Sequence, residues 1–522
     1  MSSRFAPAID SLDAGVRSSS QFRSWLRSRR WCGDAIGMRT KVTVKDRVVL
    51  GETSTEAFVL FLAIAHEPAE QIVLHLPLSL STVRTAPDVF DLPVGEQRFY
   101  VNEAERQEAF ARFLVAGFQR EQRIPTEAGD VVQFRGTRTA AFRGIGPEVA
   151  EDTSNLLVRI ETADGTIVFK SYKLLDVRNR EPEILRRLDT KGFRHVPRYV
   201  GELALGRDSD RVVLGVATEH VEGVDLFSWF VQGWRDELAP HAPSTISFEE
   251  AGLDLVRGLG AATVALHEAL FERRPGPFHA ETFGPEDGTA ARRAALTNLG
   301  DALRRLAVLA KAQDSEAAGV AAKARALLFD NRPRIEETLA GLNAGIGTMK
   351  AVTHGDLHLA QVLRRASDGE ILFIDFEGEP ARPRGQRSLP LPPIRDIATM
   401  VRSFSYVTHY AWREFVGGDA MAALALLEPP RLSGSERAVA NRLLAWEGRA
   451  ADWFIRAYLE HTSLYPGLAE DETLQFLRGW MMEKAIYELR YELTHRLANV
   501  LIPLEGILAI ATVRGRGPEL LK

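Results

Sequence analysis

The hydrophobic pattern of the chain changes near residue 223, from the alternation of strands to the spacing of helices. Before that point, apolar and polar residues alternate in four segments, which are 41–83, 156–160, 167–172 and 211–216. Asp164-Gly165 lies between the second and third segments and is a strong signal for a tight turn. A helix is expected at about 181–191. The pattern therefore predicts the order strand, turn, strand, helix, strand for the middle of the chain.

Helical periodicity dominates after residue 223. It is found in 253–270, 290–309, 317–328, 333–342, 395–414, 436–460 and 471–498. Ser433 and Glu436 form a capping-box pattern, which predicts that a helix begins there. Strand-like pieces return only at 350–353, 361–364 and 371–376. This part of the chain is therefore predicted to be a large, mainly α-helical lobe.

These patterns divide the chain into three predicted parts. An N-terminal α+β cap is expected over 1–102, a β-rich small lobe over 103–222 and an α-helical large lobe over 223–522. The length of 522 residues supports more than one domain, because a single hydrophobic core rarely serves so long a chain. Residues 1–20 are rich in serine and small residues, and we expect them to be mobile.

Composition and charge narrow the function classes without selecting one. Hydrophobic residues make up 45% and charged residues 26% of the chain, and the net charge of −5 gives no basic field for nucleic acid. Cys32 is the only cysteine, which excludes an intrachain disulfide and fits a reducing cytoplasm. The apolar run 57–65 is too short to span a bilayer, and the N-terminus lacks the pattern of a signal peptide. We therefore expect a cytoplasmic protein that does not bind membranes.

Residues 354–379 carry the most informative motif. His354-Gly355-Asp356 is followed by Gln361 and, after an apolar run, by Asp375. Kinase-type active sites use this order: one aspartate orients and deprotonates a hydroxyl, while an amide and a second aspartate hold magnesium on the nucleotide phosphates. Asp356 is therefore the candidate catalytic base. Taken alone, Asp356 also fits a turn residue that accepts backbone N–H groups.

Gln361 and Asp375 are the candidate magnesium ligands. Magnesium prefers oxygen donors, and the amide and the carboxylate each offer one. The alternative role of Gln361 is that of a polar residue on a short strand. Asp375 follows the apolar run 371–374, which fits a buried strand that would hold the carboxylate rigidly. Asp396, at the start of a helix, fits stabilisation of the helix dipole, and it is also expected to brace the catalytic loop rather than to take part in the chemistry.

A second set of residues is assigned to the nucleotide. Lys170 ends an apolar strand, and we expect it to bind the α- and β-phosphates with Glu183 of the following helix as its partner. Lys173 is the competing lysine, and a surface lysine beside a helix glutamate is the alternative. No glycine run marks a phosphate loop, so the signal there is weak. The rest of the set is Ser154, Asn155 and Glu219.

One face of the helix at 471–498 combines charged and aromatic residues. Helical spacing places together Lys484, Tyr487, Glu488 and Tyr491. Aromatic rings can stack on a sugar ring while charged groups bond its hydroxyls, so this face is a candidate substrate site. The same spacing also fits a solvated face with Glu–Lys pairs.

The assembled motifs resemble those of actinobacterial maltokinases. The matching segments are THGDLHLAQVLR at 353–364, ILFIDFEGEPARP at 371–383, PIRDIATMVRSF at 393–404 and EKAIYELRYELTHR at 483–496. The resemblance implies an α+β, bilobal protein-kinase-like fold with an N-terminal cap. It also implies ATP and Mg²⁺ as cofactors. The implied reaction is transfer of the γ-phosphoryl group to the anomeric hydroxyl of maltose, whose product, maltose 1-phosphate, feeds α-glucan and glycogen synthesis.

The resemblance also carries roles onto individual residues. The implied roles are the base for Asp356, the metal site for Gln361 and Asp375, and the phosphate anchor for Lys170 and Glu183. The face that begins at Lys484 would contact the sugar rather than solvent.

Two alternatives remain open at this point. Ala360 stands where the family more often has glycine, and related glucosamine kinases share much of the scaffold. In the first alternative, the acceptor is another sugar, such as glucosamine or an aminoglycoside. The second alternative is a non-catalytic module that binds a partner enzyme such as trehalose synthase.

Overall fold

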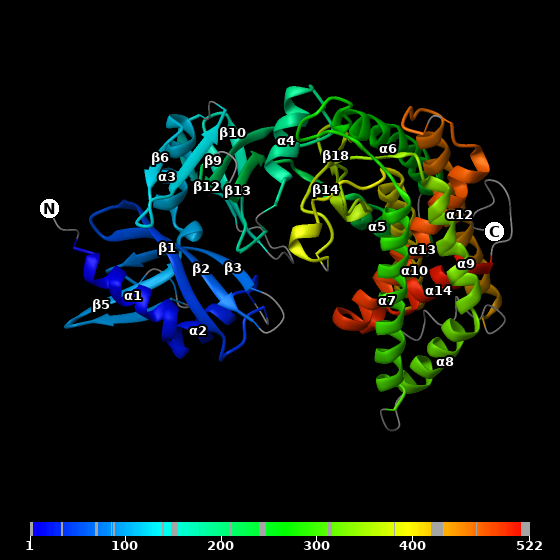
Figure 1. Cartoon of the computed structure of the whole chain (residues 1–522), viewed down its shortest axis with the longest axis horizontal. Coiled ribbons are helices and arrows are strands. Elements are labelled where there is room, and N and C mark those ends of the chain that lie inside the picture. The colour runs from blue at the N-terminus through cyan, green and yellow to red at the C-terminus, as the bar shows by residue number, and fades with distance from the viewer. Residues whose placement is uncertain are drawn as a thin grey trace. The chain divides into compact units, whose positions relative to one another are not determined.

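The computed structural model contains two compact units. The first holds residues 1–189, 197–221 and 383–387, and the second holds 190–196, 222–382 and 388–522. The residues that the structure describes are 4–32, 35–67, 71–84, 86, 89–137, 140–147, 155–176, 178–207, 211–239, 247–311, 316–380, 382–418, 432–465 and 467–512. Figure 1 draws both units and labels many of their helices and strands.

The first unit begins with two helices and an antiparallel sheet. The helices are α1 (Ala6–Ser18) and α2 (Ser20–Arg27), and the strands are β1 (Lys41–Glu52), β2 (Glu56–His66), β3 (Gln71–Ser81), β4 (Phe90–Val94) and β5 (Gln97–Glu103). The strand order is β1-β2-β3-β5-β4, and the short strand β11 (Leu174–Leu175) pairs with β3. The strands predicted within 41–83 are confirmed, and β4 and β5 are additional.

The expected mobility of residues 1–20 is wrong for the helical part of this segment. α1 buries Ala8, Ile9, Leu12 and Val16, which join the hydrophobic core under the first sheet. These residues recur at helical spacing and form one apolar stripe. The serine-rich composition concealed this stripe, because composition averages over positions and says nothing of their order.

A second antiparallel sheet follows in the same unit. Its order is β6-β7-β12-β13-β10-β9-β8. The bounds are β6 (Arg123–Pro125), β7 (Val131–Gly136), β8 (Phe142–Ile145), β9 (Leu156–Thr162), β10 (Gly165–Ser171), β12 (Tyr199–Leu205) and β13 (Val212–Glu219). Thr162 pairs with Gly165 across the turn between β9 and β10, as the Asp164-Gly165 signal predicts. α4 (Glu181–Thr190) confirms the expected helix, whereas β12, buried along its whole length, is additional.

α3 (Glu108–Arg120) joins the two sheets of the first unit through aromatic side chains. Phe110 contacts Phe58 of β2, with ring centroids 5.6 Å apart. Phe118 contacts Phe134 of β7 at 5.6 Å and Phe169 of β10 at 6.3 Å. One helix therefore packs on both sheets of the first unit.

The second unit is mainly helical. Its helices are α5 (Leu226–Leu238), α6 (Phe248–Leu270), α7 (Pro285–Leu309), α8 (Glu316–Asp330), α9 (Arg332–Ala340), α10 (Ile394–Val416), α12 (Gly434–Leu459), α13 (Glu470–His495) and α14 (Leu501–Thr512). The predicted helices are confirmed, and α5 and α14 are additional. Ser433 and Glu436 form the predicted capping box at the start of α12. α10 and α13 pack against each other and are buried along most of their lengths.

Short strands in the second unit position the loops that carry the motif. β14 (Gly223–Asp225), β17 (Val362–Arg365) and β18 (Ile371–Phe373) form one antiparallel sheet. β15 (Glu281–Thr282) pairs with β16 (Met349–Lys350), which leads into the His354-Gly355-Asp356 loop. Gln361 directly precedes the β17–β18 hairpin and Asp375 follows it, so the hairpin brings the two residues side by side.

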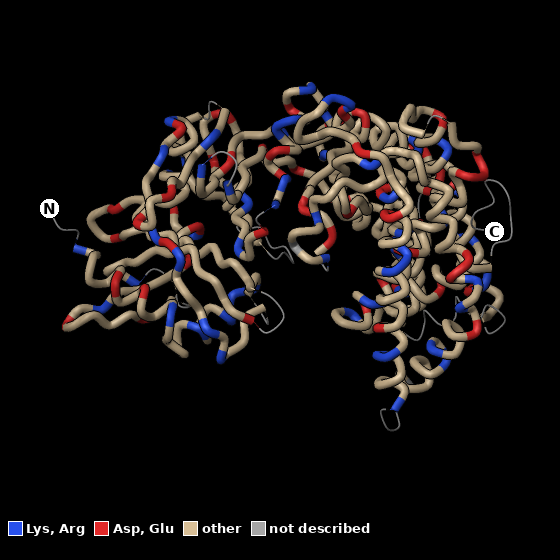
Figure 2. The backbone as a smooth tube through the Cα atoms, in the orientation of Figure 1, with Lys and Arg blue, Asp and Glu red and all other residues tan. Residues whose placement is uncertain are grey.

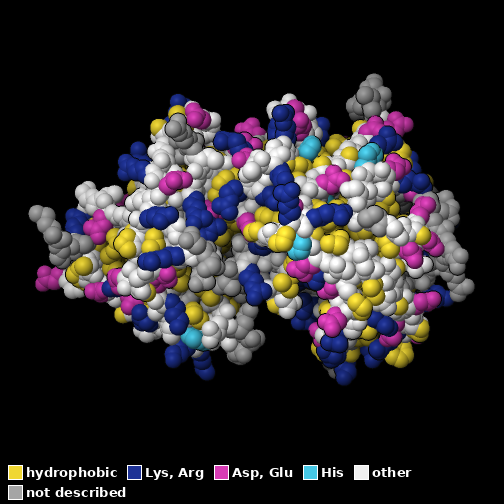
Figure 3. Space-filling view, turned by 45° about the horizontal axis from the view of Figure 1, so that its top comes forward, with side chains coloured by type: hydrophobic (Ala, Val, Ile, Leu, Met, Phe, Trp, Pro, Cys, Tyr) yellow, Lys and Arg dark blue, Asp and Glu magenta, His cyan; other side chains and the backbone are white. Residues whose placement is uncertain are grey.

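Charged residues of both signs are distributed over both units. Figure 2 shows lysine and arginine interspersed with aspartate and glutamate along the chain, including α7 and α8. On the face drawn in Figure 3, basic, acidic and apolar side chains are similarly mixed. No described helix combines the length and the hydrophobicity that crossing a membrane requires.

Candidate active site

Asp356 lies on a loop that Asp396 holds in place. The backbone N–H groups of His354 and Gly355 donate to the two carboxylate oxygens of Asp396, at 2.9 and 3.1 Å. Asp396 belongs to the first turn of α10. Burial favours its neutral form, but the hydrogen bond and charge of His267 outweigh burial, so the pKa of Asp396 lies below its ordinary value. The predicted contact between Asp396 and this loop is confirmed, and its effect on catalysis stays a prediction.

A buried chain of hydrogen bonds continues behind Asp396. His267 Nε2 lies 3.2 Å from Asp396 Oδ2, and His267 Nδ1 lies 2.9 Å from the hydroxyl oxygen of Tyr458. His267 comes from α6 and Tyr458 from α12. Sequence reasoning missed His267, because 129 positions separate it from Asp396 and no local motif links the two.

Asp356 forms a buried ion pair with Lys484 of α13. Lys484 Nζ lies 3.1 Å from Asp356 Oδ1 and 2.6 Å from Glu379 Oε1. Burial would raise the pKa of Asp356, but the Lys484 ammonium and His358, whose Nε2 is 3.7 Å away, hold it well below its usual range. The pKa of Lys484 is raised in turn, because the two carboxylates outweigh its burial. Asp356 is therefore a carboxylate, and Lys484 a cation, at neutral pH.

Glu379 connects this ion pair to two arginines. Arg395 Nη2 lies 2.6 Å from Glu379 Oε2, and Arg382 donates to the same oxygen. Arg382 also binds Glu483 Oε1 at 3.1 Å. Burial would raise the pKa of Glu379, but Arg395 and Lys484 outweigh it and lower the pKa to about 2. Sequence reasoning missed Glu379, because its motif contains other carboxylates and no local pattern distinguishes Glu379 from them.

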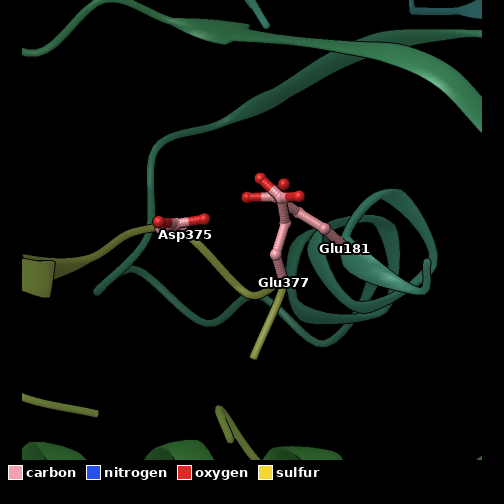
Figure 4. Close-up of side chains that lie close together, drawn as sticks. All are labelled: Glu181, Asp375 and Glu377. Atoms are coloured by element: carbon pink, nitrogen blue, oxygen red, sulfur yellow. The ribbon is translucent and has the colours of Figure 1, made fainter. Parts of the chain in front are cut away.

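Gln361 and Asp375 lie side by side in the same unit. Gln361 ends the 3-10 turn Leu359–Gln361 rather than lying on a strand, and its Nε2 donates to Asp375 Oδ2 at 3.1 Å. Asp375 has φ of 64°, a left-handed conformation that aspartate tolerates better than most residues. Figure 4 shows Asp375 and Glu377 on the loop that follows β18. The amide and carboxylate oxygens of Gln361 and Asp375 are hard donors, so this pair fits a magnesium site.

Lys170 of β10 pairs with Glu181 and not with Glu183. Its Nζ lies 2.9 Å from Glu181 Oε2, and the Tyr172 hydroxyl donates to the same oxygen at 2.5 Å. Glu181 is the first residue of α4, which Figure 4 also shows. Glu183 lies about 200° further around the helix, and it binds Arg180 at 2.8 Å instead. The predicted Lys170–Glu183 pair is therefore wrong.

Of the other residues assigned to the nucleotide, Asn155 and Glu219 occupy separate places in the first unit. Ser154 lies outside the described residues. Asn155 directly precedes β9. Glu219 is the last residue of β13, and its Oε2 lies 3.7 Å from Arg198 Nε. Their roles toward a nucleotide stay predictions.

The predicted sugar-binding face of α13 is largely buried. Lys484, Tyr487 and Glu488 expose only 4%, 7% and 8% of their surfaces, so the solvated alternative is wrong. The rings of Tyr487 and Tyr491 stack with centroids 6.4 Å apart and an interplanar angle of 14°. Glu488 Oε2 lies 3.1 Å from Arg402 Nε. Contact of this face with a sugar stays a prediction.

Comparison with known proteins gives the family. Residues 146–433, more than half of the chain, match the model of the phosphotransferase enzyme family. The chain belongs to this family. It is 31% identical to a glucosamine kinase of Streptacidiphilus jiangxiensis over 217 residues, which are 41% of this chain and 44% of that protein. It is 26% identical to a glucosamine kinase of Mycolicibacterium smegmatis over 294 residues, 56% of this chain and 65% of that protein. The chain therefore matches less than two thirds of either relative.

Solved structures confirm the predicted fold class for this phosphotransferase. A glucosamine kinase in complex with glucosamine, ADP and inorganic phosphate has a TM-score of 0.60, covering 92% of this chain and 97% of its own. A crystal form of glucosamine kinase gives 0.59, covering 92% and 96%. Both are 19% identical to the chain, so this likeness concerns the fold alone. The fold is α+β and kinase-like, with a β-sheet lobe and a helical lobe, and the comparisons do not single out maltokinases.

Proposed function

We propose that the protein is a kinase that transfers the γ-phosphoryl group of ATP to a hydroxyl of a small sugar. Membership of the phosphotransferase family supports the reaction class. The observation that carries the proposal is Asp356, a buried carboxylate kept ionised by Lys484 on a loop that Asp396 fixes. An ionised carboxylate in a rigid loop can accept a hydrogen bond from a neutral hydroxyl and then its proton.

The proposed chemistry gives each group of the loop a defined task. Asp356 orients the acceptor hydroxyl, and its carboxylate takes the proton as the new oxygen–phosphorus bond forms. The bond between the γ-phosphorus and the bridging oxygen breaks, and ADP leaves with that oxygen. Because Lys484 lowers the pKa of Asp356, the carboxylate is a weak base. A weak base suits a loose transition state, in which positioning matters more than early proton removal.

Binding of the nucleotide is proposed to depend on two further groups. Gln361 and Asp375 would hold Mg²⁺, which supplies positive charge to the phosphate oxygens when bound. Lys170, held by Glu181, would bind the α- and β-phosphates. The corrected partner strengthens this role, because Glu181 is 3% exposed and keeps the ammonium in a fixed place.

Two acceptors are proposed, and each has its own support. Glucosamine is the first, because both curated relatives are glucosamine kinases. Maltose, phosphorylated at its anomeric hydroxyl, is the second, because the segments 353–364, 371–383 and 483–496 resemble maltokinases. Lys484 already balances the charge of Asp356. We therefore expect the part of either acceptor that binds beside Asp356 to be uncharged. The names of the relatives give no support to trehalose synthase as a partner.

The aromatic face of α13 supports a sugar as the acceptor class. The rings of Tyr487 and Tyr491, which are one helical turn apart, stack nearly in parallel. The Lys484 ammonium lies over the Tyr487 ring. Flat aromatic surfaces beside charged groups suit a sugar, whose C–H faces are apolar and whose hydroxyls are polar. In this proposal, Tyr491 is the more accessible of the two rings and would contact the sugar directly.

An acceptor panel tests the proposed function. Purified protein with Mg-ATP is given glucosamine, maltose, glucose and an aminoglycoside in turn, and ADP release is measured. Phosphorus NMR then assigns the phosphorylated position. We expect one acceptor to stimulate ADP release, and the stimulation to be lost in Asp356→Asn. Binding of Mg-ATP without stimulation by any acceptor would overturn the sugar-kinase proposal, and no nucleotide binding would favour a non-catalytic module.

A further inference from the structure

Four consecutive residues, 170–173, bind two buried carboxylates; the first two end β10 and the other two follow it. Lys170 and Tyr172 both bind Glu181 Oε2, at 2.9 and 2.5 Å. Side chains alternate along an extended chain, so these two lie on one side of the segment. That side presents the ammonium which the proposed function assigns to the nucleotide phosphates.

The other two residues of the segment face Glu105 of the 3-10 turn Ala104–Arg106. Ser171 Oγ and Lys173 Nζ both donate to Glu105 Oε1, each at 2.7 Å. The side chains of Lys173 and Glu105 are only 1% and 0% exposed, and the Lys173 ammonium lies 5.1 Å from the centre of the Trp31 ring. A slip of the segment by one residue would exchange its two sides, so the contacts of Ser171 and Lys173 with Glu105 fix the side on which Lys170 lies. Glu105 therefore specifies which residues face Glu181.

His75 of β3 holds the backbone of the same segment. Its backbone N–H donates to the Lys173 carbonyl at 3.0 Å, and its ring Nδ1 lies 2.9 Å from the Tyr172 carbonyl oxygen. A carbonyl oxygen only accepts, so Nδ1 carries the proton. Burial and the nearby Lys173 lower the pKa of His75 to about 3, which keeps the ring neutral.

The backbone of Tyr172 is thus held from two sides. Its N–H donates to the Leu214 carbonyl of β13 at 2.9 Å, while its carbonyl accepts from His75 in the cap. β11 then continues into the cap sheet by pairing with β3. The chain passes from the β-rich sheet to the cap sheet at this residue, two positions after Lys170.

We infer that His75 and the Glu105–Lys173 pair are positioning residues for ATP. They fix the register and the orientation of segment 170–173, and so the place of the Lys170 ammonium beside Glu181. The inference rests on the proposed function, in which Lys170 binds the phosphates. The three residues act through Lys170, so the cap contributes to nucleotide affinity while the acceptor and the chemical step depend on other groups.

Substitution of His75 provides the sharpest test. His75→Leu removes the ring donor and keeps an apolar side chain, whereas the amide nitrogen of His75→Asn can take the place of Nδ1. Loss of one buried hydrogen bond is expected to raise KM for ATP about tenfold in His75→Leu. KM for the sugar and kcat at saturating ATP should stay within about twofold, and His75→Asn should restore most of the ATP affinity. His66→Leu, on the neighbouring strand β2, is the matched control and should leave KM for ATP unchanged.

A second variant covers the case in which His75→Leu fails to fold. Glu105→Gln keeps the size of the side chain and one acceptor oxygen but removes the charge opposite Lys173. It should raise KM for ATP by about threefold to tenfold, again without affecting KM for the sugar. Thermal melting of each variant shows that the protein measured is folded.

The outcomes separate a positioning role from a purely structural one. Unchanged KM for ATP in folded His75→Leu and Glu105→Gln would overturn the inference, and so would an equal effect on ATP, sugar and kcat. Calorimetric dissociation constants for Mg-ATP give the same comparison without turnover. If the wild-type protein binds Mg-ATP but phosphorylates no sugar, the proposed function fails, and these binding constants still test the positioning role.

Discussion

Lys484 Nζ lies 3.1 Å from Asp356 Oδ1, although 128 positions separate the two residues in the chain. The pair joins the catalytic loop to α13, and the same ammonium binds Glu379. Water does not reach these groups freely, because the side chains of Lys484, Asp356 and Glu379 are only 5%, 13% and 0% exposed. A buried charge without its partner is costly, so the ionised state of Asp356 depends on the packing of α13.

Removing the carboxylate of Asp356 should stop most of the chemistry and spare the fold. Asp356→Asn keeps the shape of the side chain but cannot accept the proton from the acceptor hydroxyl. We expect kcat to fall by about 10²–10⁴-fold, the range for loss of a general base. Single-turnover kinetics with ATP and the best acceptor measure this. Turnover within about twofold of the wild type would remove the assigned role.

Removing the cation should affect stability as well as activity. Lys484→Met leaves Asp356 and Glu379 facing each other without a shared ammonium, and breaking a buried pair in this way costs about 3–5 kcal/mol. Urea denaturation at neutral pH measures the free energy of unfolding. The matched control is Lys311→Met, because Lys311 is exposed. A similar stability for both variants would show that the buried network is not a stabilising element.

The stability of the protein should depend on Glu379 in acid. Its pKa is about 2 in the folded protein, against an ordinary value of 4.5. A lowered pKa means that the ionised form stabilises the fold, so its contribution is complete above pH 4.5 and is lost as the pH falls toward 2. Between these values, the free energy of unfolding should decline more steeply in the wild type than in Glu379→Gln. The exposed Glu286→Gln serves as the control, and equal slopes in all three proteins would contradict the assignment.

Two glutamates of α4 should differ sharply in their effect on ATP. Glu181→Gln removes the charge that holds Lys170, so KM for ATP should rise about tenfold, as expected for loss of a charged hydrogen bond. Glu183→Gln removes only the partly buried pair with Arg180 and should leave KM for ATP within about twofold. Steady-state kinetics with varied ATP compare the two variants. If Glu183→Gln had the larger effect, the pairing in the structure would not be the functional one.

The brace of the catalytic loop should act on turnover. The carboxylate of Asp396 accepts hydrogen bonds from two backbone N–H groups of the loop. In Asp396→Asn, an amide NH₂ group replaces one of the two acceptor oxygens, so the loop loses one hydrogen bond and shifts. We expect kcat to fall by about 10²-fold, because misplacement by about 1 Å has effects of that size. Asp471→Asn, an exposed first-turn aspartate of α13, is the control. Equal kcat values in both variants would contradict the bracing role.

Local pattern was enough for most of the fold. The alternation in 41–83, the tight turn at Asp164-Gly165 and the capping box at Ser433 act over a few residues, so each could be predicted without a structure. Composition misled at 1–20, where the order of apolar residues in α1 outweighs the high content of serine. β12 escaped prediction because Gly201 and Glu202 interrupt its apolar pattern, although tertiary packing buries all of its residues.

The sequence by itself determined the motif of the candidate site, because Asp356, Gln361 and Asp375 lie close together in the chain and in a recognisable order. Only the tertiary structure decided the partners: Glu181 rather than Glu183 for Lys170, His267 for Asp396, and Lys484 for Asp356. The reason is physical. Periodicity reports on neighbours along one helix or strand, whereas an ion pair depends on side-chain direction and on packing between elements that the chain brings together from far apart.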